Sequence, residues 1–127
     1  MRASLVLLTL LAFACEKQSS APDDRSPLAA ARCQTQAIQS KSVTSWLDCF
    51  HPDLREQVGA ALAKKPPDWA DLAVKNQRIE KATEASFELE TPTDTRRGDQ
   101  HARLRLDDDS FEVARLAGRW YIVDSGL

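Results

Sequence analysis

The hydrophobic pattern of this chain changes its period once, near Ile79, and this change limits the possible folds most strongly. Before Ile79, apolar side chains recur every three or four residues, as they do along one face of an α-helix. After that point, apolar and polar residues alternate with a period of two, which is typical of β-strands. A chain with helices first and strands afterwards predicts an α+β fold, in which N-terminal helices pack on one face of an antiparallel sheet.

Three helices and a short helical turn are expected before the sheet. Residues 28–39 are rich in alanine with few helix breakers, and residues 43–50 carry four large apolar side chains at helical spacing. Asp53, followed by Glu56 three residues later, matches a capping box and predicts the start of a third helix. Asp68 is expected to cap the short turn that follows.

Four strands are expected in the second half, at residues 79–89, 102–106, 111–116 and 119–123. The outward positions of the first strand are acidic and those of the second are basic, which favours pairing by a few tenths of a kcal/mol per pair. A tight turn at Ala117-Gly118 is expected between the last two strands. Together they predict a curved four-stranded antiparallel meander. The positions expected to face the helices are Ile79, Thr83, Ala85, Phe87, Leu89, Ala102, Leu104, Leu106, Trp120 and Ile122.

The first fifteen residues predict export. Met1-Arg2 is positively charged, residues 3–13 form an almost unbroken apolar run, and Ala14-Cys15 stands at the change to a polar sequence. This is the layout of a secretory signal, and the apolar run is shorter than the roughly 20 residues that span a bilayer. We therefore expect residues 1–14 to be a signal peptide that is cleaved between Ala14 and Cys15.

Residues 11–15, Leu-Ala-Phe-Ala-Cys, resemble the lipobox of bacterial lipoproteins. The resemblance implies that Cys15 is acylated, with palmitate among its acyl groups, and that this lipid anchors the chain to a membrane. Glu16 at the next position favours the outer membrane, with the domain facing the periplasm. Ala12-Phe13-Ala14 also fits the Ala-x-Ala site of an ordinary exported protein, so a soluble periplasmic or secreted protein with a free Cys15 thiol is the alternative.

The composition after the expected cleavage site predicts a tether and one domain. Residues 15–27 are rich in Ser, Asp and Pro and cannot bury apolar surface, so they are expected to form a lipidated cysteine and a flexible tether. Residues 28–127 are long enough for one small domain. Loss of Arg2 leaves 16 of the 17 basic residues against 19 acidic ones, a net charge of −3. This balance argues against nucleic acid as a partner.

Cys33 and Cys49 remain as a pair if Cys15 is acylated. An oxidising compartment favours a disulfide between them, which would close a loop of about 17 residues and stabilise the fold by about 3 kcal/mol. On one straight helix the two residues would lie about 24 Å apart, whereas a disulfide allows about 7 Å between Cα atoms. The bridge therefore requires a chain reversal, expected at Ser40-Lys41-Ser42. The alternative is two buried free thiols.

Two segments resemble the small secreted members of the nuclear transport factor two-like superfamily. Residues 117–124, Ala-Gly-Arg-Trp-Tyr-Ile-Val-Asp, look like the Gly-x-Trp strand that closes these domains, and residues 45–55 resemble their second-helix region. The resemblance implies a cone-shaped α+β fold with a pocket, and often a homodimer formed through the open sheet face. It implies no single activity, because members include isomerases, dehydratases and domains without known chemistry.

No expected inward position is a general acid or base, so we expect no catalytic residue, no cofactor and no metal site. Asp48 and Asp124 are the only carboxylates kept as candidates, and His51 is expected to cap a helix. His51-Pro52-Asp53 also matches the tripeptide of J-domain co-chaperones, but its surroundings do not, so a helix start is favoured. Asp107-Asp108-Asp109 is interpreted as a solvated turn rather than a cation site.

Three functions are considered. The favoured one is a non-catalytic domain, held on the cell envelope by lipid, that binds a hydrophobic small molecule or an envelope protein. The second is a structural or assembly lipoprotein that docks a larger envelope complex through its sheet face, at or near Glu84, Glu88, Arg103 and Arg105. The third is an isomerase-like or hydrolase-like enzyme, which the missing acid–base pair disfavours. Candidate pocket walls, for which core packing is the commoner role, are Trp46, Trp69, Phe87, Leu104 and Trp120.

Overall fold

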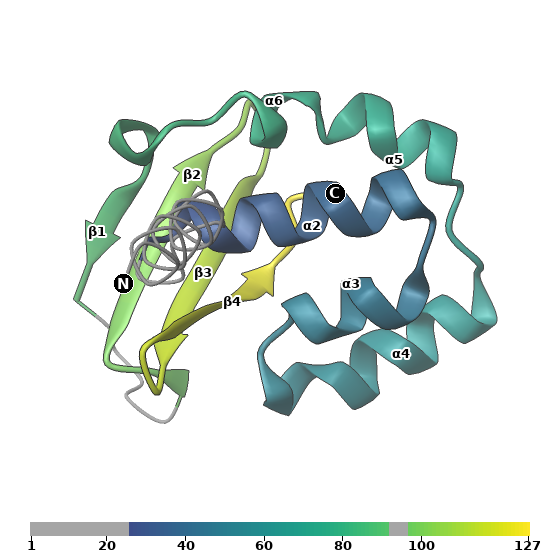
Figure 1. Ribbon diagram of the computed structural model, residues 1–127, viewed down its shortest axis with the longest axis horizontal. Helices are drawn as coiled ribbons and strands as arrows, with labels where there is room; N and C mark the ends of the chain where they lie inside the picture. Colours follow the sequence, from purple (N-terminus) through teal and green to yellow (C-terminus); the bar gives the residue numbers. More distant parts are fainter. Residues whose placement is uncertain (1–25, 92–96) are drawn as a thin grey trace, which may run out of the picture.

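The computed structural model describes residues 26–91 and 97–127, which form an α+β fold (Figure 1). Within these ranges, five α-helices precede a four-stranded antiparallel sheet with the strand order β1-β2-β3-β4. The predicted fold class and meander are therefore confirmed. None of the described helices is long and apolar enough to cross a membrane. The expected signal peptide, Cys15 and most of the expected tether lie outside the described residues.

The helices confirm most of the local predictions. Lys41 ends the first helix in the left-handed conformation, and the Ser42 hydroxyl accepts a hydrogen bond from the Ser45 amide at the start of the next one. Asp68 caps its helix by accepting from the Asp71 amide at 3.2 Å. The helical elements are α2 (Leu28–Ser40), α3 (Val43–Cys49), η1 (Pro52–Leu54), α4 (Arg55–Lys64), α5 (Trp69–Lys75), α6 (Gln77–Glu80) and η2 (Glu84–Ser86).

The predicted capping box at Asp53 is wrong. Asp53 lies inside the 3-10 turn η1, and α4 begins after Leu54 without a side-chain cap. The cap of η1 is His51, whose ring accepts a hydrogen bond from the Asp53 amide at 3.2 Å. The sheet decides this arrangement, because the His51 amide donates to the Ile122 carbonyl at 2.9 Å and places the buried ring beside the turn.

The strands are β1 (Glu88–Glu90), β2 (Gln100–Arg105), β3 (Ser110–Leu116) and β4 (Arg119–Asp124). The last two are joined at Ala117 and Gly118, with φ angles of 53° and 81°. Positive φ at both central residues is the signature of a type I′ hairpin turn, whose twist matches that of the strands. The tight turn predicted at these two residues is therefore confirmed.

The long strand predicted at residues 79–89 is wrong. Its first part is helix α6, its middle is the turn η2, and only Glu88–Glu90 pairs with β2. Ile79 is fully buried, but on a helix, whereas Leu89 is 68% exposed. Thr83 and Ala85 are also exposed. The reason for the exposed Leu89 is that α2 lies over the centre of the sheet and leaves β1 uncovered (Figure 1).

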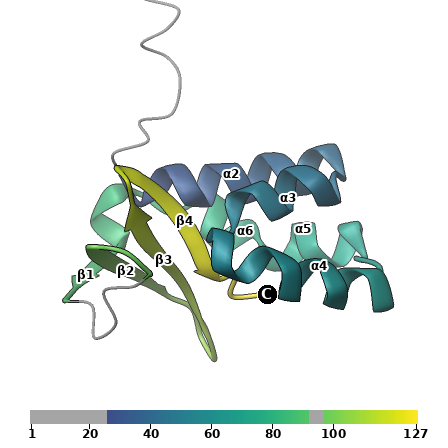
Figure 2. The same ribbon diagram turned by 90° about the horizontal axis from the view of Figure 1, so that it is seen from below.

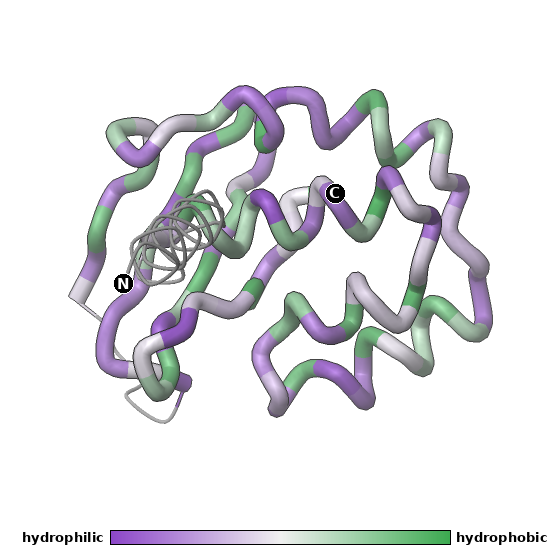
Figure 3. Tube along the Cα trace, in the orientation of Figure 1, coloured by the Kyte–Doolittle hydropathy of each residue, from purple (hydrophilic) through white to green (hydrophobic). Residues whose placement is uncertain are grey.

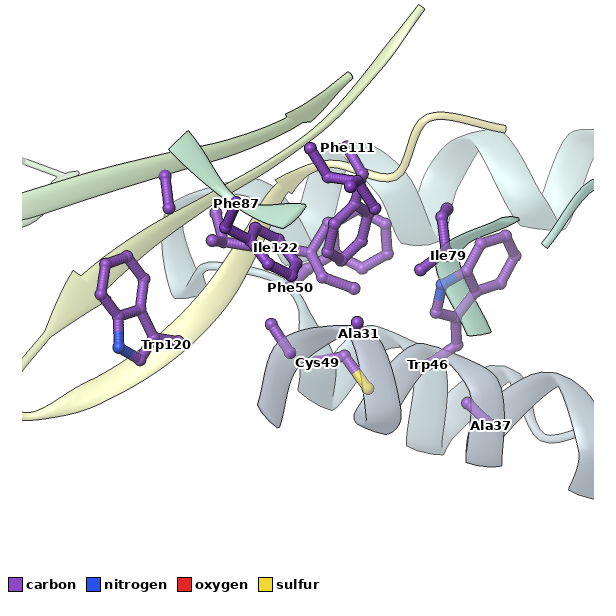
Figure 4. Packing of buried hydrophobic residues seen from close by; sticks show 14 residues of the cluster. Ala31, Ala37, Trp46, Cys49, Phe50, Ile79, Phe87, Phe111, Trp120 and Ile122 are labelled. Atoms are coloured by element: carbon purple, nitrogen blue, oxygen red, sulfur yellow. The ribbon is translucent and has the colours of Figure 1, made fainter. Parts of the chain in front are cut away.

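The core lies between α2 and the sheet (Figure 2). Small alanines of α2 allow close approach, and Phe111 and Ile122 from the sheet are fully buried against this layer. Helices α3, α4 and α5 extend the helical layer beyond the β4 edge of the sheet (Figures 1 and 2). Hydrophobic and hydrophilic residues follow one another along the strands, as a sheet with one covered face requires (Figure 3). The resulting cluster is drawn in Figure 4.

Candidate functional site

A disulfide joins Cys33 on α2 to Cys49 at the end of α3, with 5.8 Å between their Cα atoms. The predicted bridge is therefore confirmed, together with the predicted reversal between the two helices. Cys49 is buried in the core beside α2 (Figure 4), and Cys33 packs against the same cluster. The bridge thus ties the helical layer together, and the thiol of Cys15 is left outside the described residues.

The five predicted pocket-wall residues are packed into the core or against it. Trp46, Phe87, Leu104 and Trp120 are buried, and the partly buried Trp69 lies with its ring centroid 6.0 Å from that of Trp46. None of the three hollows described below is lined by any of these side chains. The structure therefore places them in the core-packing role that the sequence also allowed.

The candidate acid–base residues make structural hydrogen bonds. Asp124 accepts from the Gly126 amide at 3.0 Å, and Asp48 is exposed with its backbone carbonyl bound by Arg55. His51 is buried, and its two ring nitrogens contact the Asp53 amide and the Arg97 carbonyl, the second at 2.7 Å. Because a carbonyl can only accept, Nε2 of His51 carries the proton and Nδ1 accepts. The predicted capping role of His51 is confirmed.

The acidic turn at residues 107–109 is exposed between β2 and β3, as expected. Asp107 forms an ion pair with Arg78, and the hydrogen bond in this pair lowers the pKa of the Asp107 carboxyl and raises the pKa of the Arg78 guanidinium. Asp109 accepts from the Ser110 amide at 2.8 Å. Over the described residues, no cluster of three or more His, Cys, Asp or Glu side chains is arranged to hold a metal ion.

A buried polar network links the helices to the C-terminal segment, and the sequence reasoning missed it. Gln34 on α2 accepts from Trp46 Nε1 at 3.0 Å, and its own Nε2 donates to Asn76 Oδ1 at 3.0 Å and to the Ser125 carbonyl at 3.2 Å. Asn76 in turn donates to the Thr35 hydroxyl at 2.9 Å. One signal was available, since helical spacing places Gln34 on the same face as the alanines that line the core.

Three hollows stand out on the described surface. The first, about 270 Å³, lies between α2 and α6, and another of about 560 Å³ lies between the acidic turn and the C-terminal residues. The remaining one, about 210 Å³, is named here the outer-face hollow. Residues of all four strands and of the connection before β2 line it. Its lining residues are Glu90, Arg97, His101, Ala102, Glu112, Val113 and Val123.

Charged side chains form a ladder across the outer face of the sheet. Arg103 contacts Glu90 on β1 at 3.4 Å and Glu112 on β3 at 3.1 Å, while Arg105 contacts Glu88 at 3.3 Å. The predicted pairing of an acidic with a basic strand is thus confirmed for β1 and β2. Glu84, which was expected on the same face, lies in the turn η2 instead.

Two irregular features meet at the outer-face hollow. In the described part of the chain, two buried side-chain atoms form no hydrogen bond, His101 Nε2 and Arg103 Nε, although Arg103 Nε faces the Glu90 carboxylate at 3.4 Å in an ion pair. They belong to neighbouring outward positions of β2. The pairing register of β3 with β4 shifts between Glu112 and Val113, as at a β-bulge. Buried polar atoms without partners are rare in folded proteins, and bulges are common beside functional sites.

No family model, no curated protein and no solved structure matches this chain. The resemblance to the nuclear transport factor two-like superfamily therefore stays a prediction.

Proposed function

We propose that this chain is an exported lipoprotein, anchored through Cys15 to the outer membrane, whose domain binds a ligand or an envelope protein without catalysis. The observation that carries the proposal is the Cys33–Cys49 disulfide between α2 and α3. Structural disulfides persist in oxidising compartments and are rare in the cytosol. The disulfide therefore supports the export that the N-terminal sequence predicts.

The contacts of the candidate acid–base groups support a binding role over a catalytic one. Both ring nitrogens of His51 have partners, and Asp124 accepts from a backbone amide. A general base needs a lone pair that is free to reach a substrate proton. Each of these groups instead holds a strand, a turn or a connection in place.

The proposal is tested by comparing three forms of the full chain in a bacterial host with two membranes. The wild-type chain is expected in the outer-membrane fraction, with the mass of residues 15–127 plus acyl groups and less two hydrogens. Cys15→Ser is expected to incorporate no labelled palmitate. The matched control, Cys33→Ser with Cys49→Ser, removes the other two cysteines and should still be acylated. A wild-type chain that is soluble and has the mass of the unmodified residues 15–127 would overturn the proposal.

A further inference from the structure

We propose that the outer-face hollow binds a neutral, hydroxyl-rich small molecule of about the size of one sugar ring. The inference starts from His101 Nε2, which is buried and without a hydrogen-bond partner among the described residues. His101 lines the hollow, and Arg103 holds the two glutamates that line it on either side. A buried nitrogen without a partner loses its water and gains nothing in return, so a polar ligand at this point restores the lost hydrogen bond.

The charges around the hollow select a neutral ligand. Glu90, Glu112 and Arg97 line the hollow, and Arg103 contacts both carboxylates, so the charges of these four residues balance. A cationic ligand would meet the arginines and an anionic one the glutamates, and like charges at short range in a partly desolvated site are costly. The balanced arrangement therefore favours a ligand that carries dipoles instead of a net charge.

The hydrogen-bonding groups select hydroxyls. Glu90 and Glu112 each contact Arg103 through Oε1, which leaves the second oxygen of each carboxylate as an acceptor without a partner among the described residues. His101, which lines the same hollow, offers Nε2, and this nitrogen can donate or accept. A hydroxyl group both donates and accepts, so adjacent hydroxyls on one ring match this alternation of donors and acceptors.

The size of the hollow limits the ligand to one ring. Its volume of about 210 Å³ is below the roughly 300–1,000 Å³ of sites for drug-sized ligands. Val123 supplies an apolar part of the lining, which suits the C–H groups of a sugar ring. Its position on the face away from α2 leaves the hollow accessible beside the register shift at Glu112. The assignment rests on the proposed binding role but not on the lipid anchor.

The test uses the two histidines of the chain as paired reporters. The purified, acylated chain in detergent micelles, or the processed chain as isolated if it carries no lipid, is labelled with ¹⁵N at the histidine rings. It is then titrated with glucose, N-acetylglucosamine and the N-acetylglucosamine disaccharide. We expect a saturable shift of the His101 ring signals that is clearly larger than any shift of the His51 signals, because the His51 ring reaches the hollow only through its hydrogen bond to the Arg97 carbonyl. Shifts that do not saturate, or that are equal at both rings, would overturn the inference.

Matched variants locate the binding energy. His101→Phe and Arg103→Lys are each expected to weaken binding of the best neutral probe by about tenfold or more, measured by calorimetry. Arg105→Lys changes the neighbouring rung of the same ladder, outside the hollow, and should leave the affinity unchanged. Tighter binding of glucosamine or gluconate than of glucose would refute the selection for a neutral ligand. A chain that is acylated but binds no saccharide would reject this inference and leave the lipid anchor standing. A chain that binds saccharide but is not acylated would support this inference and reject the lipid anchor.

Discussion

Replacing Gln34 with leucine is expected to lower the free energy of unfolding by about 3 kcal/mol. Gln34 is fully buried and satisfies Trp46 Nε1, Asn76 Oδ1 and the Ser125 carbonyl. Leucine has a similar volume, so the main effect is to leave two buried polar groups and one partly buried carbonyl without this partner. At about 1.5 kcal/mol for each group the loss is about 4.5 kcal/mol. Burial of the leucine side chain returns about 1.5 kcal/mol of this.

The assay is urea denaturation followed by circular dichroism and tryptophan fluorescence. We expect a lower midpoint for Gln34→Leu at an unchanged dependence on urea, because the same surface is exposed on unfolding. Gln36→Leu makes the same chemical change at an exposed position of α2 and should stay within about 0.5 kcal/mol of the wild type. A loss below about 1 kcal/mol for Gln34→Leu would refute the reasoning, since it would mean that the three groups find other partners.

Three further predictions concern the disulfide, an ion pair and a glycine. Cys33→Ala with Cys49→Ala should cost about 3 kcal/mol, and reduction of the wild type should reproduce this loss in urea. Arg115 donates two hydrogen bonds to Asp99, at 3.1 and 2.7 Å, and lowers the pKa of its carboxyl below the ordinary 3.8. The ion pair of Asp99 with Arg115 therefore stabilises the fold fully above pH 3.8. This stabilisation is lost as the pH falls through the lowered pKa of Asp99. Thermal melts of Asp99→Asn and the wild type should differ at neutral pH and converge in strong acid. A Cβ atom at Gly98 would lie 2.2 Å from the Arg115 carbonyl oxygen, so Gly98→Ala should lower the melting temperature, at a cost of about 1–3 kcal/mol; an unchanged melting temperature would contradict this.

Elements whose stabilising contacts lie within a few residues could be predicted from the sequence. The Asp68 cap reaches Asp71, and the hairpin turn needs only two residues that tolerate positive φ. The reversal between α2 and α3 could be predicted for the same reason, because the Ser42 side chain caps α3 by a hydrogen bond with the nearby Ser45 amide. The disulfide was predicted from this reversal together with the limit on the distance between the two Cα atoms, and the structure confirms it.

The errors occur where distant residues decide the outcome. A period of two predicted a strand at residues 79–89, but Ile79 belongs to α6, which contacts α2 and fills the core beneath it. Asp53 matches a capping box, yet the His51 ring is the cap of the turn η1. A hydrogen bond from the His51 amide to the Ile122 carbonyl holds His51 in this position. A periodic pattern records which side chains prefer burial, and it does not record which neighbour buries them.

The sequence by itself determined that helices precede strands, and it determined the Asp68 cap and the Ala117-Gly118 turn. It favoured the pairing of Cys33 with Cys49 over two free thiols, and the structure decided it. Only the tertiary structure decided that the predicted pocket walls are core, that Gln34 joins a buried network, and that the outer-face hollow exists. Side chains as far apart in sequence as Glu90 and Val123 line that hollow because strand register brings them together. Register depends on the packing of the whole sheet, and no local pattern specifies it.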